Sequence, residues 1–178
     1  MNDASAKDTP VSCAIALGSN LGHSRQVMAS ALDRLGSLEG TTVMAQSSLY
    51  KTAPVGPPQP DYLNACAILQ TRLSPHALMQ SLLAIEADFG RLRQERWGPR
   101  ILDLDLILYA DWVIHEPDLH LPHPRFRERA FVLVPLAEIA PTWIDPVTGQ
   151  SMAELCSRLD SHGIEPLPPS PPFNPSTL

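Results

Sequence analysis

Two aspartates, Asp103 and Asp105, stand one residue apart in the leucine-rich stretch RILDLDLILYAD. On a strand, residues i and i+2 point to the same side of the sheet, so both carboxylates share one face and the neighbouring leucines share the other. Two adjacent carboxylates repel each other unless a cation balances them. Arg100 could supply that charge, and so could Mg²⁺, which proteins usually hold with one or two carboxylates plus substrate phosphates and water. From this pair alone, a solvated strand face or an arginine-bridged pair is the simpler interpretation.

The segment before this strand, GRLRQERWGPR (90–100), combines four arginines, a tryptophan and two glycines. Guanidinium groups match the geometry of phosphate oxygens and bind them through charge-assisted hydrogen bonds. Together with carboxylates that suit a metal, the segment predicts a polyphosphate site with a mobile lid. A solvated basic loop is the alternative.

Two further segments carry aromatic and polar side chains. In TAPVGPPQPDYLNA (52–65), Tyr62 and Asn64 share one strand face and could bind a flat heterocycle by stacking and hydrogen bonding. Taken alone, a core tyrosine and a turn-forming asparagine would be the commoner explanation. In LPHPRFRERAF (121–131), His123 and Phe131 flank three arginines. A lone histidine in such a place is usually structural.

Composition restricts the class of partner. The chain has 178 residues, enough for one domain with its own core, and a formal net charge of -6, which argues against a general nucleic-acid binder. Seven of its 13 basic residues nevertheless fall within 91–129, a distribution that suits a small anion. Three widely spaced cysteines indicate reduced thiols rather than disulfides or a zinc site. The N-terminal residues lack a signal-like apolar run, and no run could span a membrane, so we expect a cytoplasmic protein without nucleic-acid or membrane partners.

These side chains require a sheet that positions them. We expect strands at 12–19, 43–52, 62–71 and 101–109, a helix capped by Ser24 and ended by Gly36, and a helix capped by Ser74 and ended before Gly90. The order β-α-β-β-α-β predicts an α+β, ferredoxin-like fold: a four-stranded antiparallel sheet with helices on one face and the site on the other side. AFVLVPLAEIA (130–140) is ambiguous between strand and helix, with helix favoured, and SMAELCSRL (151–159) predicts a last helix. Residues 1–10 are expected to be a flexible tail, 11–165 the domain, and 166–178 a proline-rich disordered tail.

Four segments in order, IALGSNLG, SSLYKTAPVGPPQPDYLNA, RWGPRILDLDLILYAD and LPHPRFRERAFVLVPLAEIAP, carry a resemblance to the 6-hydroxymethyl-7,8-dihydropterin pyrophosphokinase family over roughly residues 12–145. That family transfers pyrophosphate from ATP to a pterin alcohol in folate biosynthesis, and its fold is the ferredoxin-like one. The resemblance implies two Mg²⁺ ions on Asp103 and Asp105, ATP as co-substrate, 6-hydroxymethyl-7,8-dihydropterin as acceptor, and a monomer.

The resemblance also implies residue roles. Arg91 and Arg100 would join the two aspartates in catalysis by contacting the phosphates. The nucleotide would be bound by Glu86, Arg93, Arg96, Leu106, His123 and Arg129. The pterin would be bound by Thr52, Ala53, Val55, Tyr62, Asn64, Trp97 and Phe131. The chain departs from better-known bacterial members in a shorter lid loop without its lysine, and in Asp118 and His120 at nucleotide-binding positions. A different metal-dependent nucleotide transferase and a non-catalytic pterin or nucleotide sensor remain alternatives.

Overall fold

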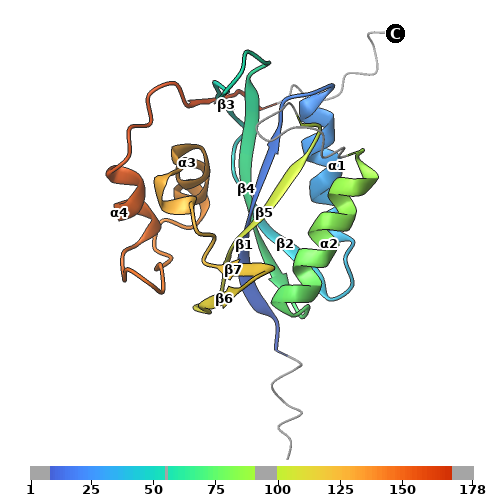
Figure 1. Ribbon diagram of the computed structural model, residues 1–178, viewed down its shortest axis with the longest axis vertical. Coiled ribbons are helices and arrows are strands. Elements are labelled where there is room, and N and C mark those ends of the chain that lie inside the picture. The colour runs from blue at the N-terminus through green and yellow to red at the C-terminus, as the bar shows by residue number, and fades with distance from the viewer. Residues whose placement is uncertain (1–8, 55, 91–99, 170–178) are drawn as a thin grey trace, which may run out of the picture.

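The chain, described by a computed structural model over residues 9–54, 56–90 and 100–169, is built on one antiparallel sheet (Figure 1). Within these ranges the sheet has six strands, in the order β5-β1-β4-β3-β8, and β2 also pairs with β4. Their bounds are β1 (Val11–Ser19), β2 (Thr41–Gln46), β3 (Tyr50–Thr52), β4 (Tyr62–Thr71), β5 (Asp103–Tyr109) and β8 (Glu165–Pro166). A separate hairpin joins β6 (Ile114–Glu116) to β7 (Leu119–Leu121).

The expected count of four strands is wrong, because segment 43–52 forms two strands and the tail adds another. β2 and β3 pair with opposite ends of β4. Between them, the Ser48 backbone N–H and hydroxyl both donate to Glu138 Oε1, at 3.0 and 2.9 Å. Ser48 is therefore bonded to a helix instead of to the sheet, and the strand is interrupted there.

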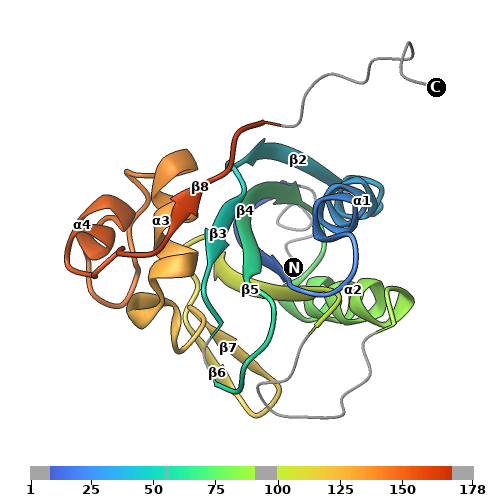
Figure 2. The ribbon, with the colours of Figure 1, turned by 90° about the horizontal axis from the view of Figure 1, so that it is seen from above.

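Helices cover both faces of the sheet, so the expectation of helices on one face alone is also wrong. α1 (Ser24–Gly36) and α2 (Pro75–Asp88) lie on one side, while α3 (Ala130–Ile139) and α4 (Met152–Ser157) lie on the other (Figure 2). The ambiguous segment is thus the favoured helix, with Pro135 inside it. Val132, Leu133 and Leu136 are buried there against the sheet, because α3 is apolar almost all round.

The two predicted helix caps have different outcomes. Ser74 caps α2 as expected: its Oγ accepts from the Ala77 N–H at 3.2 Å, and Pro75 occupies the first helical position. Ser24 is not the cap of α1. It is the first helical residue, preceded by His23, and its hydroxyl accepts a hydrogen bond from the Ser19 hydroxyl at 2.9 Å.

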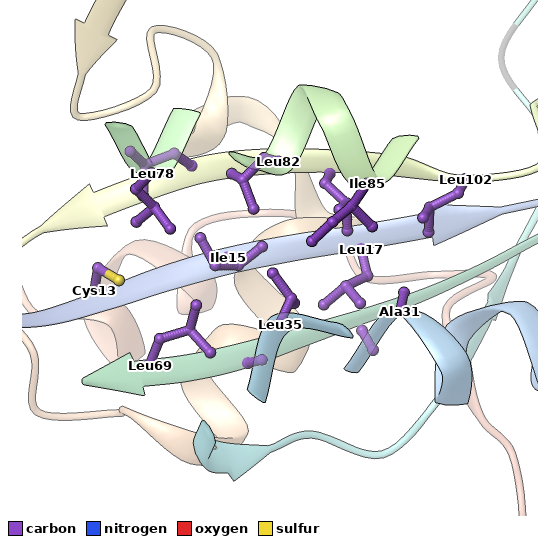
Figure 3. Packing of buried hydrophobic residues seen from close by; sticks show 14 of the residues in the cluster. Cys13, Ile15, Leu17, Ala31, Leu35, Leu69, Leu78, Leu82, Ile85 and Leu102 are labelled. Carbon is purple, nitrogen blue, oxygen red and sulfur yellow. The ribbon is translucent and has the colours of Figure 1, made fainter. Parts of the chain in front are cut away.

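A hydrophobic core fills the space between the sheet and the first helix pair. The leucines that alternate with the aspartates, Leu102, Leu104 and Leu106, face this core as expected, so the aspartates face the opposite side. Figure 3 shows side chains from β1, β4 and both helices meeting there. They include Cys13, Ile15, Leu17, Ala31, Leu35, Leu69, Leu78, Leu82 and Ile85.

The first residues of the proline-rich segment are ordered against the sheet. In β8, Glu165 pairs with Lys51 and Pro166 with Tyr50, which is compatible with proline because β8 is an edge strand. The Leu167 N–H then donates to the Leu49 carbonyl at 2.7 Å. The part of the proline-rich tail at 170–178, and the N-terminal residues 1–8, lie outside the described residues. Among the helices that the structure describes, none is long and apolar enough to cross a bilayer.

Candidate active site

The α3 side of the sheet carries a floor of small residues between the aspartates and the predicted heterocycle platform. In the strand register, Gly18 of β1 lies between Asp103 and Asn64, and Ala16 lies between Asp105 and Cys66. Because β1 presents almost no side-chain volume here, a cavity of about 480 Å³ opens above it. It is lined by Ala16, Leu17, Gly18, Thr52, Ala53, Tyr62, Asn64, Arg100, Asp103, Asp105, Arg125, Glu128, Arg129, Phe131 and Val132.

Each aspartate in this cavity faces a different arginine. Arg100 Nη1 donates to Asp103 Oδ1 at 3.0 Å, and Arg129 Nη1 lies 3.8 Å from Asp105 Oδ2. The aspartate side chains are 29% and 32% exposed. The sequence suggested that arginine could balance the charge of the aspartates, and these contacts show that it does. Both carboxylates nevertheless remain open to the cavity. Two carboxylates side by side on one wall also fit the all-oxygen ligand set that Mg²⁺ prefers.

The heterocycle platform lies on the same floor. Asn64 is buried, and its Nδ2 donates to Thr52 Oγ1 at 2.7 Å, which fixes the amide across neighbouring strands. Tyr62 pairs with Thr52 in the β3–β4 ladder, and burial raises the pKa of its phenol, with Arg100 opposing. Phe131 enters the cavity from the first turn of α3, with the Arg129 guanidinium 5.7 Å from its ring centroid. The cavity therefore has aromatic rings on two elements and a fixed amide between them.

His123 is held as a neutral imidazole next to the cavity arginines. Burial lowers its pKa from 6.5 to about 4, with Arg129 and Arg125 acting in the same direction and Asp103 opposing them. The Arg125 backbone N–H donates to His123 Nδ1 at 3.2 Å, which requires an unprotonated nitrogen at that position. At neutral pH the side chain is therefore a polar group without charge.

Not every predicted residue reaches the cavity. Glu86 is buried in α2, where its Oε1 accepts the Leu104 N–H at 2.7 Å, and Leu106 is buried in the core on the helix side. His123 is also not among the described residues that line the cavity. Nucleotide contacts for these three therefore stay predictions. The predicted residues Val55, Arg91, Arg93, Arg96 and Trp97 lie outside the described residues.

Comparison with known proteins decides the family. Residues 14–141 match the model of 7,8-dihydro-6-hydroxymethylpterin-pyrophosphokinase (HPPK). The chain belongs to this family. A 2-amino-4-hydroxy-6-hydroxymethyldihydropteridine pyrophosphokinase of Synechocystis is 45% identical over 172 residues, covering 95% of this chain and 88% of that protein. Its Pseudomonas aeruginosa namesake is 44% identical over 155 residues, covering 86% of this chain and 95% of that protein.

More distant relatives are longer proteins. The folic acid synthesis protein fol1 of Pneumocystis carinii is 38% identical over 156 residues, which are 87% of this chain and only 21% of that protein. The crystal structure of wild-type Plasmodium falciparum HPPK-DHPS superposes with a TM-score of 0.66 at 13% identity. That match covers 83% of this chain and 44% of the other, and it shows the similarity of the fold.

In this HPPK-family chain, sequence reasoning missed part of the cavity wall. Arg125 and Glu128 line it and form an ion pair between Nε and Oε1 at 2.6 Å, which lowers the pKa of the Glu128 carboxyl. Their spacing of three residues, on a 3₁₀ turn where i and i+3 align, was the available signal. Gly18 and Ala16 were visible within IALGSNLG, but a small residue on a strand indicates the floor of a cavity only when the residues beside it in the sheet are known.

A second group of possible metal ligands lies apart from this cavity. His76, Glu116 and Asp118 place their ligand atoms within 4.8 Å of one another, and His76 Nε2 lies 2.6 Å from Glu116 Oε2. His76 and Glu116 already form a hydrogen-bonded pair on the surface, and Asp118 is an exposed carboxylate beside them. The group therefore has a sufficient explanation without an ion.

Proposed function

We propose that the chain transfers the pyrophosphoryl group of ATP to the hydroxymethyl oxygen of 6-hydroxymethyl-7,8-dihydropterin and releases AMP, with Asp103 and Asp105 holding two Mg²⁺ ions. The transfer itself, a step of folate biosynthesis, follows from membership of the family. The observation that supports the residue roles is that the aspartate pair and the ring-binding platform line the same cavity. A phosphate donor and a flat acceptor can thus meet over β1.

Charge balance favours metal on the aspartates. A bound triphosphate carries roughly −4 and the two carboxylates −2, so two Mg²⁺ ions would neutralise most of that charge and help to orient the phosphates. Arg100 and Arg129 already lie beside the carboxylates. Their guanidinium groups can therefore bind phosphate oxygens and stabilise the charge that develops on transfer.

The acceptor would lie between Tyr62 and Phe131. Offset stacking of the pterin against these rings would fix its plane, and the Asn64 amide would recognise its ring edge by hydrogen bonds. Asn64 is suited to this task because its hydrogen bond to Thr52 prevents rotation of the amide. The hydroxymethyl group would then point toward the aspartates, where positioning supplies much of the rate acceleration.

The test is a reaction with separated nucleotides. The protein is incubated with ATP, Mg²⁺ and 6-hydroxymethyl-7,8-dihydropterin, with a control that lacks the pterin. AMP formed only with the pterin would support pyrophosphoryl transfer, and its loss with EDTA would support the metal. ADP would indicate transfer of a single phosphate. Binding of both ligands without any product would favour a non-catalytic sensor. Nucleotide transfer that does not require the pterin would favour a different metal-dependent nucleotide transferase.

A further inference from the structure

Asp145 is a fully buried carboxylate outside the cavity and beyond the residues that match the family model. It accepts from Arg127 at both oxygens, at 2.6 Å from Nε and 2.8 Å from Nη2. It also accepts from the Thr148 hydroxyl at 2.7 Å and the Val147 N–H at 3.1 Å. Burial alone would raise the pKa of Asp145, but these hydrogen bonds lower it overall, so the group stays ionised.

The turn that carries Asp145 is itself fixed between α3 and α4. Asp145 donates its N–H to the Gln150 carbonyl at 2.8 Å and accepts the Gly149 N–H at 2.9 Å. Directly after the turn, the Met152 N–H donates to Trp143, and the Met152 side chain is buried in the same core cluster as Phe126. Asp145 is therefore a rigid anchor, held by backbone on both sides and by the core below.

Arg127 connects this anchor to the cavity wall. It belongs to the 3₁₀ turn η2 (Phe126–Glu128), which precedes α3. Glu128 lines the cavity from this turn, Arg125 and Arg129 line it from the residues on either side, and Arg127 is bonded to Asp145 instead. The bidentate ion pair, together with the buried Phe126, thus holds the short segment from which three charged groups reach the proposed phosphate site.

We propose that Asp145 is a positioning residue for nucleotide binding, which acts through Arg127 to fix the turn that presents Arg125 and Arg129 to the triphosphate. The inference rests on the proposed function. A single 3₁₀ turn has poor internal hydrogen bonding, so its orientation depends on side-chain anchors. The pterin platform does not depend on this anchor, because α3 is held by Val132, Leu133 and Leu136 against the sheet.

The experiment compares ligand binding by Asp145→Asn with that of the wild-type full-length chain. Asparagine preserves the shape of the side chain but removes the charge that fixes the Arg127 guanidinium. Affinity is measured by calorimetry for α,β-methylene-ATP with Mg²⁺, which cannot be cleaved at the transferred bond, and separately for the pterin. We expect the nucleotide Kd to rise about tenfold and kcat to fall by a similar factor. The pterin Kd should remain within about twofold.

Glu154→Gln is the matched control. It weakens the capping box of α4, where the Ser151 N–H donates to Glu154 Oε2 at 2.7 Å, and so loosens the same part of the fold without touching Arg127. We expect both ligands to bind this variant normally. Equal nucleotide affinity in Asp145→Asn and Glu154→Gln would overturn the inference, as would equal weakening of both ligands. If the wild type makes no AMP, the proposed function fails, whereas the binding comparison still decides the role of Asp145.

Discussion

Asp103 and Asp105 are each balanced by an arginine, yet these ion pairs contribute little to folding. Partly exposed pairs of this kind are worth about 0–1 kcal/mol because solvent screens them. Two like charges one residue apart on a strand also repel each other. The arrangement is therefore poorly explained by stability. It is consistent with the proposed function, in which the arginines would bind phosphate and the carboxylates would hold metal.

The first prediction concerns this exchange. Asp103→Asn and Asp105→Asn keep the side-chain shape and remove one ligand charge, so turnover should fall on the order of 10³-fold. The unfolding free energy should change by less than about 1 kcal/mol. Steady-state AMP formation and urea unfolding are the two measurements. Asp88→Asn is the control, since Asp88 pairs with Arg34 on the exposed surface. Near-normal turnover in either cavity variant would refute the metal assignment.

The second prediction concerns His123, whose pKa is lowered to about 4 by burial and by Arg129 and Arg125. Between its unfolded pKa of 6.5 and its folded pKa, the native state binds fewer protons than the unfolded chain. The contribution of His123 to stability must therefore fall as the pH drops through this window and level off below it. The effect is at most about 3 kcal/mol, and partial exposure makes it smaller.

Urea unfolding in EDTA, from about pH 7 to about pH 4, tests this effect. The His123→Gln variant should lose less stability over that range than the wild type. His162→Gln, a change at an exposed histidine outside the cavity wall, serves as the control and should follow the wild type. Parallel curves for His123→Gln and the wild type would show that His123 is not the titrating group.

At the scale of elements, β1 matters for the volume it leaves empty. A Cβ at Gly18 would lie 3.1 Å from Asn64 Oδ1, an atom that cannot easily retreat because its amide is bonded to Thr52. Glycine weakens a strand, so its place here is explained by close approach rather than by stability. Ala16, two residues before Gly18, is also small and lies beside Asp105 in the register.

The third prediction follows for Gly18→Ala. The added methyl should displace the Asn64 amide and weaken pterin binding about tenfold, while stability changes by less than about 1 kcal/mol, since alanine restricts the unfolded chain. Fluorescence titration with the pterin measures the first effect and urea unfolding the second. Gly36→Ala is the control, because its Cβ would make an ordinary 3.6 Å contact with Val43. Unchanged pterin affinity in Gly18→Ala would contradict the role assigned to Asn64.

Elements with local signals were predictable from the sequence, and those with distant causes were not. The alternation around Asp103 identified both the strand and the face of its carboxylates, and Ser74 with Pro75 located the start of α2. The break between β2 and β3 depends on Glu138, which lies 90 residues from Ser48. The apolar pattern of α3 indicated burial but not which face of the sheet it would cover.

The residues of the candidate site also differ in whether the sequence could predict them. Thr52, Ala53, Tyr62, Asn64 and Phe131 were predicted through their motifs, and all of them line one cavity. Leu106 shows the limit of this approach, because the alternation already placed its side chain in the core, away from the cavity, while the resemblance implied a nucleotide contact there. The link between Arg127 and Asp145 has no local signal at all, since it joins the turn η2 to the loop that follows α3.

For the whole molecule, two helical layers on opposite faces of the sheet determine where the cavity can lie (Figure 1). A hydrophobic core fills the space between the sheet and the pair α1 and α2. On the other face, α3 and α4 cover part of the sheet with a second hydrophobic cluster. The cavity lies where β1, β3, β4 and β5 meet η2 and the first turn of α3. β3 is the shortest of these cavity strands, and it carries Thr52 at its end.

The last prediction is that the C-terminal segment stabilises this short strand. Residues 165–168 cover its outer edge through the β8 ladder and the Leu167–Leu49 hydrogen bond, and the Pro168 carbonyl accepts from Arg25 Nη2 at 3.2 Å. Ending the chain after Ile164 removes these bonds and should lower the unfolding free energy by about 1–3 kcal/mol. Pterin affinity should fall more than nucleotide affinity, because the loosened strand positions Thr52 and, through it, Asn64.

Calorimetry with each ligand and urea unfolding test this prediction against a shorter deletion. Ending the chain after Pro169 retains every one of these contacts, and it should behave as the full chain in both measurements. If the two truncations have equal stability, the edge contacts add nothing to the fold. If the longer deletion weakens nucleotide and pterin equally, β3 does not act on the pterin side alone. A selective loss of pterin affinity would show that a proline-rich segment can complete a binding site by supporting the edge of a sheet.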